Sequence, residues 1–356
     1  MNIFFVESPL QYLSAVEAQE CFRLAPETCL LIINEGVSKH NLEQILNIVK
    51  PERWKAKHIL SGPANRVTDL KKMAKLWPFV KAQGRIDRFF MGEYRSKLMR
   101  FAAHASQCDD IYLLDDGNAS LLAYHYLKDR VFEQKATGFI RRHLDAINAL
   151  IGVKDILRLT FFTAYKLEPF DFVSVKVNTY AHLASSLDSL EVSGEVYFLG
   201  QPFLEKNELD ASYYYEYLAL IKKHFQGKPV IYISHRREGK EKLQFIQDSL
   251  GFEIRQFNAP IELVFCRENQ IPSVLASFFS SALTSCHSMF GSKLKITAFY
   301  IDPQHINSHY FPIRNFSDKR HVSNIYRYIS KNVCDVIDLN EQIPHSSHHV
   351  SETQVS

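Results

Sequence analysis

The sequence predicts an α/β protein made of two Rossmann-like halves, each with a doubly wound parallel sheet. Short β-rich apolar runs alternate with helical segments over roughly the first 130 residues, which is typical of a parallel sheet. The alternation stops in a middle segment and restarts at Gly194. A length of 356 residues also fits two domains better than one.

Each element of the first half follows from its local pattern. Residues 2–6 form an apolar run that Glu7 ends, and Ser8 and Pro9 then supply a cap and a first-turn proline for a helix. Further strands are expected at 29–33, 58–60, 88–91 and 111–114, and helices near 41–48, 96–104 and 119–127.

The second half repeats this pattern. Strands are expected at 196–199, 229–233, 274–279 and 294–301, helices at 213–225, 239–250 and 282–289, and a short element at 262–265. We therefore expect an N-terminal domain over residues 1–185, a C-terminal domain over residues 190–340 and a disordered tail over residues 341–356.

The composition is that of a soluble globular protein, with 46% hydrophobic and 23% charged residues. A net charge of +3 does not favour a nucleic-acid-binding protein. The six cysteines are scattered, mostly in apolar runs, and are expected to be reduced core residues. We see neither a signal peptide nor an apolar run of the ~18 residues that span a bilayer, so a cytoplasmic protein is expected.

Residues 141–166 are rich in Leu and Ile, with interspersed basic residues. We favour a core helix with a solvated basic face, while an amphipathic segment on an anionic membrane is the alternative. The segment would suit a homodimer interface and peripheral contact with the cytoplasmic face of an inner membrane equally well.

Two carboxylates stand where a central strand is expected to end and a helix to begin, at Asp115 and Asp116, followed by Gly117. Ligands of open α/β sheets bind at this edge. Adjacent like charges tend to separate in pKa, which suits one of them to act as a base. An N-cap and a turn aspartate would explain the same pattern without any catalytic role.

Three further places carry chemistry. Ser280 and Ser281 lie between an expected strand and a helix, where free N–H groups and hydroxyls bind phosphate, although a simple N-cap is as common. His235 is followed by Arg236 and Arg237, which could bind an anionic leaving group or form a solvated basic loop. Glu262 lies amid apolar residues and needs a partner.

Several signatures are missing from the sequence. It contains no dinucleotide-binding glycine motif, Walker A loop, zinc-protease motif or hydrolase nucleophile elbow. It also lacks the Asp-x-Asp motif with which many sugar-nucleotide transferases chelate a metal. A mechanism without a metal or other cofactor is therefore favoured.

Taken together, these motifs resemble the bacterial sialyltransferases that build lipooligosaccharide and capsule, including glycosyltransferase family 52 and the capsular polysialyltransferases. The resemblance spans nearly the whole chain, and its motifs lie at residues 4–11, 115–117, 198–202, 235, 260–263 and 279–283. It implies a GT-B fold with the active site in a cleft between two facing Rossmann-like domains. It also implies a CMP-activated sialic acid donor, a glycan acceptor, inversion at the anomeric carbon and no metal.

The resemblance implies a role for each candidate residue. Asp116 would be the base that deprotonates the acceptor hydroxyl, with Asp115 as the alternative. His235 would bind the CMP phosphate, Ser280 and Ser281 would hold the same phosphate, and Glu262 would bind the cytidine ribose. The remaining substrate-binding candidates are Gly117, Arg237, Ser8, Gln11, Gly200 and Gln201.

One residue departs from the family pattern, because Arg236 stands where the family has a proline after the histidine. A proline would fix the loop, whereas Arg236 keeps an N–H group and adds charge. This leaves two alternatives open. One is a GT-B transferase that uses another CMP-nonulosonic acid or a UDP- or GDP-sugar, and the other is a non-catalytic component of a capsule-assembly complex. The acceptor, the linkage and the number of residues added do not follow from the sequence.

Overall fold

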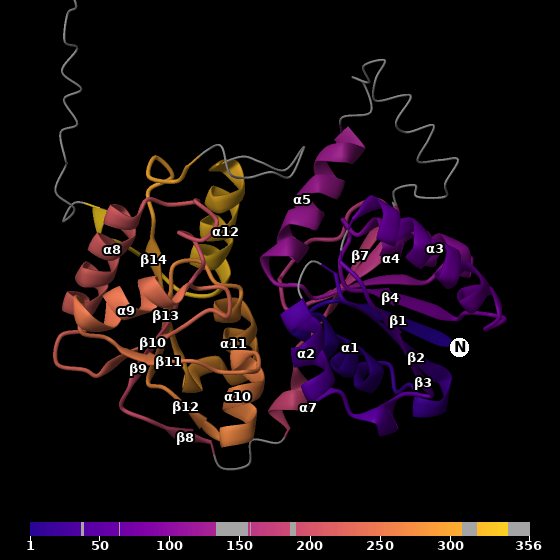
Figure 1. Cartoon of the computed structure of the whole chain (residues 1–356), viewed down its shortest axis with the longest axis horizontal. Coiled ribbons are helices and arrows are strands. Elements are labelled where there is room, and N and C mark those ends of the chain that lie inside the picture. The colour runs from indigo at the N-terminus through magenta and orange to yellow at the C-terminus, as the bar shows by residue number, and fades with distance from the viewer. Residues whose placement is uncertain are drawn as a thin grey trace, which may run out of the picture. The chain divides into compact units, whose positions relative to one another are not determined.

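The computed structural model describes residues 1–36, 39–63, 65–132, 156, 158–185, 190–307 and 319–340. The chain forms two compact units (Figure 1). Unit 1 comprises Met1–Ser193, Phe257–Ser273 and Ser280–Lys295, and unit 2 comprises Gly194–Gln256, Val274–Phe279 and Ile296–Ser356. Within the described residues no helix is long and apolar enough to cross a membrane.

Unit 1 is built on a sheet that has seven strands over the described ranges, in the order β3-β2-β1-β4-β5-β6-β7. Every neighbouring pair is parallel. The order reverses between β1 and β4, which is the switch point where open α/β sheets bind ligands. The strands are β1 (Asn2–Val6), β2 (Cys29–Asn34), β3 (Ala56–Leu60), β4 (Arg88–Met91), β5 (Ile111–Leu114), β6 (Leu159–Thr163) and β7 (Val173–Val177).

Both faces of this sheet are covered by helices, because successive strand residues point to opposite faces. Phe4 and Val6 pack with α1 (Pro9–Cys21) and α2 (Lys39–Ile48) on one face. Ile3 and Phe5 belong to the core of the other face, which is covered by α3 (Arg66–Lys81), α4 (Lys97–Ser106) and α5 (Asn118–Phe132). The doubly wound sheet that the sequence predicts is therefore confirmed.

Unit 2 repeats the design with a sheet of six strands among the residues described, ordered β11-β10-β9-β13-β14-β15. Taken in chain order, this is the same topology as the first six strands of unit 1, with its switch point between β9 and β13. The strands are β9 (Val196–Leu199), β10 (Val230–Ile233), β11 (Glu253–Arg255), β13 (Val274–Ser277), β14 (Lys295–Tyr300) and β15 (Val336–Asp338), and the helices are α8 (Ala211–His224), α9 (Lys240–Asp248) and α12 (Lys319–Asn332).

Several small elements of unit 1 come late in the chain. Helix α7 (Ala181–Ala184) contacts α10 (Ile261–Glu268) and α11 (Ala282–Phe290). Two short strands, β8 (Glu191–Val192) and β12 (Gln270–Ile271), pair in parallel. The short element expected at 262–265 is thus a full helix, α10.

The expectation for residues 141–166 is wrong at its end. Leu159–Thr163 forms strand β6 between β5 and β7, where Phe161 and Phe162 are buried on opposite faces of the sheet. The run of β-branched and aromatic residues there favours a strand, and its basic neighbours concealed this pattern. Residues 141–155 and 157, like the expected tail at 341–356, lie outside the described residues.

Candidate active site

The carboxyl ends of β1, β4 and β5 bring four acidic residues to one edge of the first sheet. Glu7 follows β1, Glu93 follows β4, and Asp115 and Asp116 follow β5. Because β1 and β4 flank the switch point, this is the edge at which a ligand is expected. The sequence predicted the two aspartates as catalytic candidates and gave neither glutamate a role of its own.

Asp115 is fixed inside the protein, with 2% of its surface exposed. Its Oδ1 accepts hydrogen bonds from the hydroxyls of Ser120 (3.2 Å) and Thr163 (3.0 Å). Its Oδ2 accepts from the Ala164 N–H (2.8 Å) and from the Tyr180 hydroxyl (3.4 Å). With both oxygens engaged, Asp115 ties β5 to β6 and to the residue that precedes α7.

Burial raises the pKa of Asp115 to about 6, although its four hydrogen bonds oppose the shift. A carboxylate that is buried and fully bonded cannot reach a substrate. Asp115 therefore acts as a structural anchor for its neighbour.

Asp116 is differently placed, since it is partly exposed and accepts a hydrogen bond from the Ser8 hydroxyl (3.2 Å). Its backbone N–H donates to Ser120 (2.9 Å), which also bonds Asp115, so the two aspartates share one serine. This geometry leaves carboxylate lone pairs of Asp116 for a substrate hydroxyl.

The pKa of Asp116 is raised well above its ordinary value by burial and then by the negative charges of Glu93 and Glu7. A hydrogen bond from Gln11 and the positive charge of Arg95 oppose the shift. Arg95 is itself paired with Glu93. Asp116 is thereby a stronger base than an ordinary aspartate.

The start of α1 supports this arrangement, as the sequence predicted for Ser8. Ser8 caps the helix by accepting the Gln11 N–H (3.2 Å), and Pro9 occupies the first turn. The Gln11 side chain accepts the Glu7 N–H (2.8 Å). Ser8 and Gln11 therefore hold the edge of the sheet around Asp116.

Gly117 brings two of the predicted motifs together within unit 1. It has a φ of +62°, and a β-carbon there would overlap the side chain of Ser281. Both constraints require glycine. The start of α11, with Ser280 and Ser281, thus lies against the turn that carries Asp116.

Ser280 and Ser281 were expected to cap α11 with their side chains, and only Ser280 accepts a backbone N–H of the first turn. Ser281 occupies the N-cap position but makes no side-chain cap hydrogen bond, and the Ala282 N–H donates to Ser280 Oγ (3.3 Å).

Glu262 is buried in α10 and accepts a hydrogen bond from the Ser285 hydroxyl of α11. Burial raises its pKa, and the bond from Ser285 opposes the shift. The partner that the sequence argument required is therefore Ser285.

His235 lies two residues after β10 in unit 2 and begins a turn, in which its carbonyl accepts the Glu238 N–H (2.9 Å). Its Nδ1 accepts the backbone N–H of Arg237 (3.1 Å), which leaves the hydrogen of the neutral ring on Nε2. Burial, followed by the charges of Arg236 and Arg237, lowers its pKa to about 3. His235 is therefore a neutral hydrogen-bond donor set in a positive field.

A buried ion pair holds the backbone of His235. Glu238 accepts the His235 N–H (2.6 Å) and pairs with Lys242 (2.6 Å), and neither charged side chain is more than 4% exposed. The hydroxyl of Tyr232 donates to the same carboxylate. This network fixes the turn by side-chain contacts, without the proline that the family resemblance led us to expect after His235.

Gly200 and Gln201 complete the edge of the second sheet. A β-carbon on Gly200 would overlap Tyr232 and Glu238, so glycine is needed for this network. Gln201, two residues after β9, joins the end of that strand to the end of β13, because its side-chain oxygen accepts the Phe279 N–H (3.2 Å). Its backbone carbonyl accepts from Lys242 of α9 (2.9 Å). Arg237, two residues after His235, is exposed.

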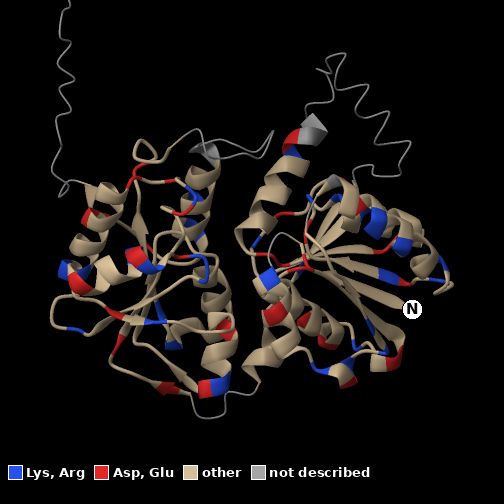
Figure 2. Cartoon of the chain, viewed as in Figure 1, with Lys and Arg blue, Asp and Glu red and all other residues tan. Residues whose placement is uncertain are grey.

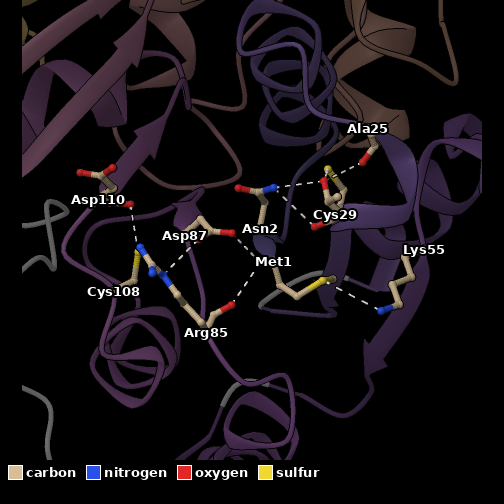
Figure 3. Close-up of polar contacts among 10 residues, drawn as sticks. Met1, Asn2, Ala25, Cys29, Lys55, Arg85, Asp87, Cys108 and Asp110 are labelled. Atoms are coloured by element: carbon tan, nitrogen blue, oxygen red, sulfur yellow. Dashed lines mark hydrogen bonds and ion pairs between the residues drawn. The ribbon is translucent and has the colours of Figure 1, made fainter.

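A large hollow in unit 1 lies away from all of these residues. This cavity of about 870 Å³ is lined by residues 84–88 and 106–110, at the amino ends of β4 and β5. Figure 3 shows the contacts around it, including the ion pair between the Met1 amino group and Asp87 (2.7 Å). It lies at the sheet edge opposite Asp116 and does not belong to the candidate site.

Sequence reasoning assigned no individual role to four charged residues that support the site: Glu7, Glu93, Glu238 and Lys242. Each glutamate comes one or two residues after a strand or within a turn, where a solvated carboxylate is the ordinary interpretation. The position of Glu7 directly after the first apolar run was the one available signal. Over the described residues, no group of three His, Cys, Asp or Glu side chains could hold a metal ion.

The model of glycosyltransferase family 52 matches residues 26–283 of the chain. The match includes both aspartates of the first sheet edge, His235, Glu262 and the two serines before α11, whereas Ser8 and Gln11 precede it. A comparison with curated proteins gave no significant match.

Solved structures resemble the chain over nearly its whole length. The α/β-galactoside α-2,3-sialyltransferase of the luminous marine bacterium Photobacterium phosphoreum superimposes with a TM-score of 0.54 at 10% identity, covering 96% of this chain and 98% of that chain. Arabidopsis thaliana UGT89C1, complexed with UDP, gives a TM-score of 0.49 at 12% identity, covering 95% and 85%. The likeness to the bacterial enzyme is one of fold, and the expected GT-B fold with its two parallel sheets is confirmed.

Replacing Asp115 by asparagine should change the pH dependence of stability. The folded chain binds this proton at a pKa of about 6, above the ordinary 3.8, so the Asp115 contribution lowers the free energy of unfolding as pH rises from 3.8 to 6. The expected fall is about 3 kcal/mol, and it should be absent in Asp115→Asn. Urea denaturation at several pH values measures it, with the exposed Asp110→Asn as control; equal slopes in wild type and Asp115→Asn would refute the assignment.

Replacing Glu238 by glutamine should strongly destabilise unit 2, because Lys242 would keep a buried charge without its closest partner. The expected loss is about 3–5 kcal/mol, and Glu238→Gln/Lys242→Met should recover much of it. Denaturant midpoints test this, and Glu253→Gln, which breaks the exposed pair with Arg255, should cost under about 1 kcal/mol. A similar small loss for Glu238→Gln would contradict the role of the buried pair.

Proposed function

The chain belongs to glycosyltransferase family 52, and we propose that it transfers sialic acid from a CMP-activated donor to a hydroxyl of a bacterial surface glycan. The observation that carries the proposal is Asp116, a carboxylate of raised pKa that follows β5 and accepts a hydrogen bond from Ser8 after the end of β1, beside the switch point of a parallel sheet. The fold likeness to a bacterial α-2,3-sialyltransferase supports the donor class.

Asp116 is the proposed general base. As the acceptor oxygen attacks the anomeric carbon, its proton passes to the Asp116 carboxylate, whose raised pKa favours this transfer. The bond from the anomeric carbon to the phosphate oxygen breaks at the same time, and CMP leaves with the bonding electrons. A single displacement of this kind inverts the anomeric configuration.

His235 is the proposed ligand of the departing phosphate. Its Nε2–H is the donor that remains after Nδ1 has accepted the Arg237 N–H. Negative charge grows on the phosphate in the transition state, and a neutral donor beside Arg236 and Arg237 stabilises it. Such donors perform the charge neutralisation that a divalent metal would otherwise supply, so we propose a metal-independent reaction.

The other candidates have supporting roles in this proposal. Ser280 and Ser281 also bind the phosphate, and Glu262 binds the cytidine ribose. Ser8, Gln11 and Gly117 shape the acceptor side around Asp116, while Gly200, Gln201 and Arg237 shape the donor side. We assign the acceptor to an N-terminal domain over residues 1–185, the donor to a C-terminal domain over residues 190–340, and the enzyme to the cytoplasm.

Arg236 is the one observation that favours a second candidate. It adds a charge beside His235 where the family has a proline, which would suit a different CMP-nonulosonic acid or another nucleotide sugar. The nucleotide preference of the protein separates these possibilities.

The rate of transfer should fall as pH falls through the raised pKa of Asp116. Glu93→Gln removes a negative neighbour and leaves Arg95 unpaired, and both changes lower the Asp116 pKa, so the acidic limb of the pH–rate profile should move to lower pH. Asp116→Asn should lower the rate about a hundredfold to ten-thousandfold without weakening CMP binding.

The measurement is initial-rate transfer to a panel of glycan acceptors across pH, with the exposed Glu43→Gln as control. An acidic limb that stays in place in Glu93→Gln, or near-normal transfer by Asp116→Asn, would exclude Asp116 as the base.

Thermal unfolding with CMP, UDP or GDP tests the donor class. CMP alone should stabilise the protein, by about 2.7 kcal/mol at a hundredfold excess over Kd, with no dependence on Mg²⁺ or EDTA. His235→Ala should reduce the shift, whereas Asp116→Asn should keep it. A shift with UDP or GDP instead would favour the second candidate, and binding of CMP without any transfer would indicate a non-catalytic component.

A further inference from the structure

The outer face of helix α3 is an apolar surface bordered by lysines. Val67, Leu70 and Trp77 are 63%, 60% and 50% exposed, and they recur at helical spacing along one side of the helix. Lys71, Lys75 and Lys81 are exposed on the same side. Figure 2 shows basic residues along this helix. We call these six residues the α3 face.

The α3 face is not needed to hold the helix on the sheet. The opposite side of α3 does this through Met73, Leu76 and Val80, which are buried in the core. Lys72 also points inward and donates to Asn34 (2.8 Å) and to the Gly62 carbonyl (2.6 Å). On the other side, the Trp77 ring has one neighbour in α4, the ring of Phe101 (6.0 Å between ring centres), yet half of Trp77 is exposed. Packing does not explain the exposure of Val67, Leu70 and the outer half of Trp77.

The charges of the α3 face have one sign. No described residue forms an ion pair with Lys71, Lys75 or Lys81, and the single carboxylate of the helix, Asp69, is on its half-buried side. Lys81 lies over the Trp77 ring, with its Nζ 5.3 Å from the ring centre. The face thus presents an aromatic ring, two aliphatic side chains and three cations.

We propose that the α3 face binds the surface of an anionic phospholipid bilayer, with the helix lying in the plane of the interface. Tryptophan, leucine and valine enter the boundary between headgroups and acyl chains, while the lysines extend to the phosphates. Each lysine near such a surface strengthens binding about fivefold. The inference is independent of the proposed sugar chemistry.

A second copy of the chain fits this surface less well. A two-fold interface places the same patch on both sides, so the lysines of one copy would face those of the other without any carboxylate between them. An anionic bilayer supplies both the apolar layer and the opposite charge.

Sedimentation with lipid vesicles tests the proposal on the full chain. The wild type should bind vesicles of phosphatidylcholine mixed with phosphatidylglycerol, bind pure phosphatidylcholine far less, and be released by high salt. Lys71→Glu/Lys75→Glu/Lys81→Glu should weaken binding about a hundredfold or more. Leu70→Ala/Trp77→Ala should weaken binding at low salt without changing its salt dependence, because it removes the apolar contribution and no charge.

Matched controls use exposed residues of unit 2. Lys223→Glu/Lys228→Glu/Lys331→Glu makes the same change of net charge, and Phe245→Ala removes an exposed aromatic ring. Both should leave vesicle binding unchanged. The proposal is overturned if the wild type does not bind the anionic vesicles, or if the control triple variant loses as much binding as the α3 variant. It is also overturned if light scattering shows a dimer that the α3 changes dissociate while vesicle binding persists.

Discussion

The buried carboxylate of Asp115 is the interaction on which the first sheet edge depends. Four donors from α5, β6, the residue after β6 and the residue before α7 converge on its two oxygens. A charge taken out of water is tolerated only when its lone pairs are satisfied in this way. Because Asp115 is occupied, the next residue along the turn is directed outward with a carboxylate that is still available. The two aspartates are chemically identical, and only their surroundings make Asp115 a structural anchor and Asp116 a group that is available for reaction.

The two sheets use the same strand order for opposite electrostatic purposes. At the first sheet edge, Glu7, Glu93 and Asp116 lie together, and burial, followed by repulsion from the two glutamates, raises the pKa of the aspartate. In unit 2, His235, Arg236 and Arg237 follow β10, and burial, followed by the charges of the two arginines, lowers the pKa of His235 and keeps the imidazole neutral. One edge is therefore suited to accept a proton and the other to bind an anion. The strand order that the two sheets share places each candidate site at the carboxyl ends of its strands, and the residues of the turns that follow the strands determine its chemistry.

The sequence predicts the strands well because most are short apolar runs ended by a polar residue, as at Val6 and Leu114. It predicts the two aspartates and the histidine because they follow such runs directly. Helix α3 was not predicted. Its apolar residues lie both on the buried side and on the exposed α3 face, so the sequence does not show the single hydrophobic stripe that indicates an amphipathic helix. Strand β6 is hidden by basic neighbours. Glu238 and Lys242 could not be found, since four-residue spacing of opposite charges is ordinary on a solvated helix and only the fold buries this pair.

The chain passes repeatedly between the two units, and this has a consequence for its synthesis. All seven strands of the first sheet have been made once Val177 is in place, but α10 and α11, which contact α7, lie within Phe257–Ser273 and Ser280–Lys295. Unit 1 therefore cannot complete its packing until these residues have been synthesised, which happens after Gly194–Gln256 of unit 2 has been made. On the ribosome, a nascent chain stalled before α10 would present a nearly complete sheet whose α7 still lacks its late partners. Chaperone contact is expected to be greatest over that interval.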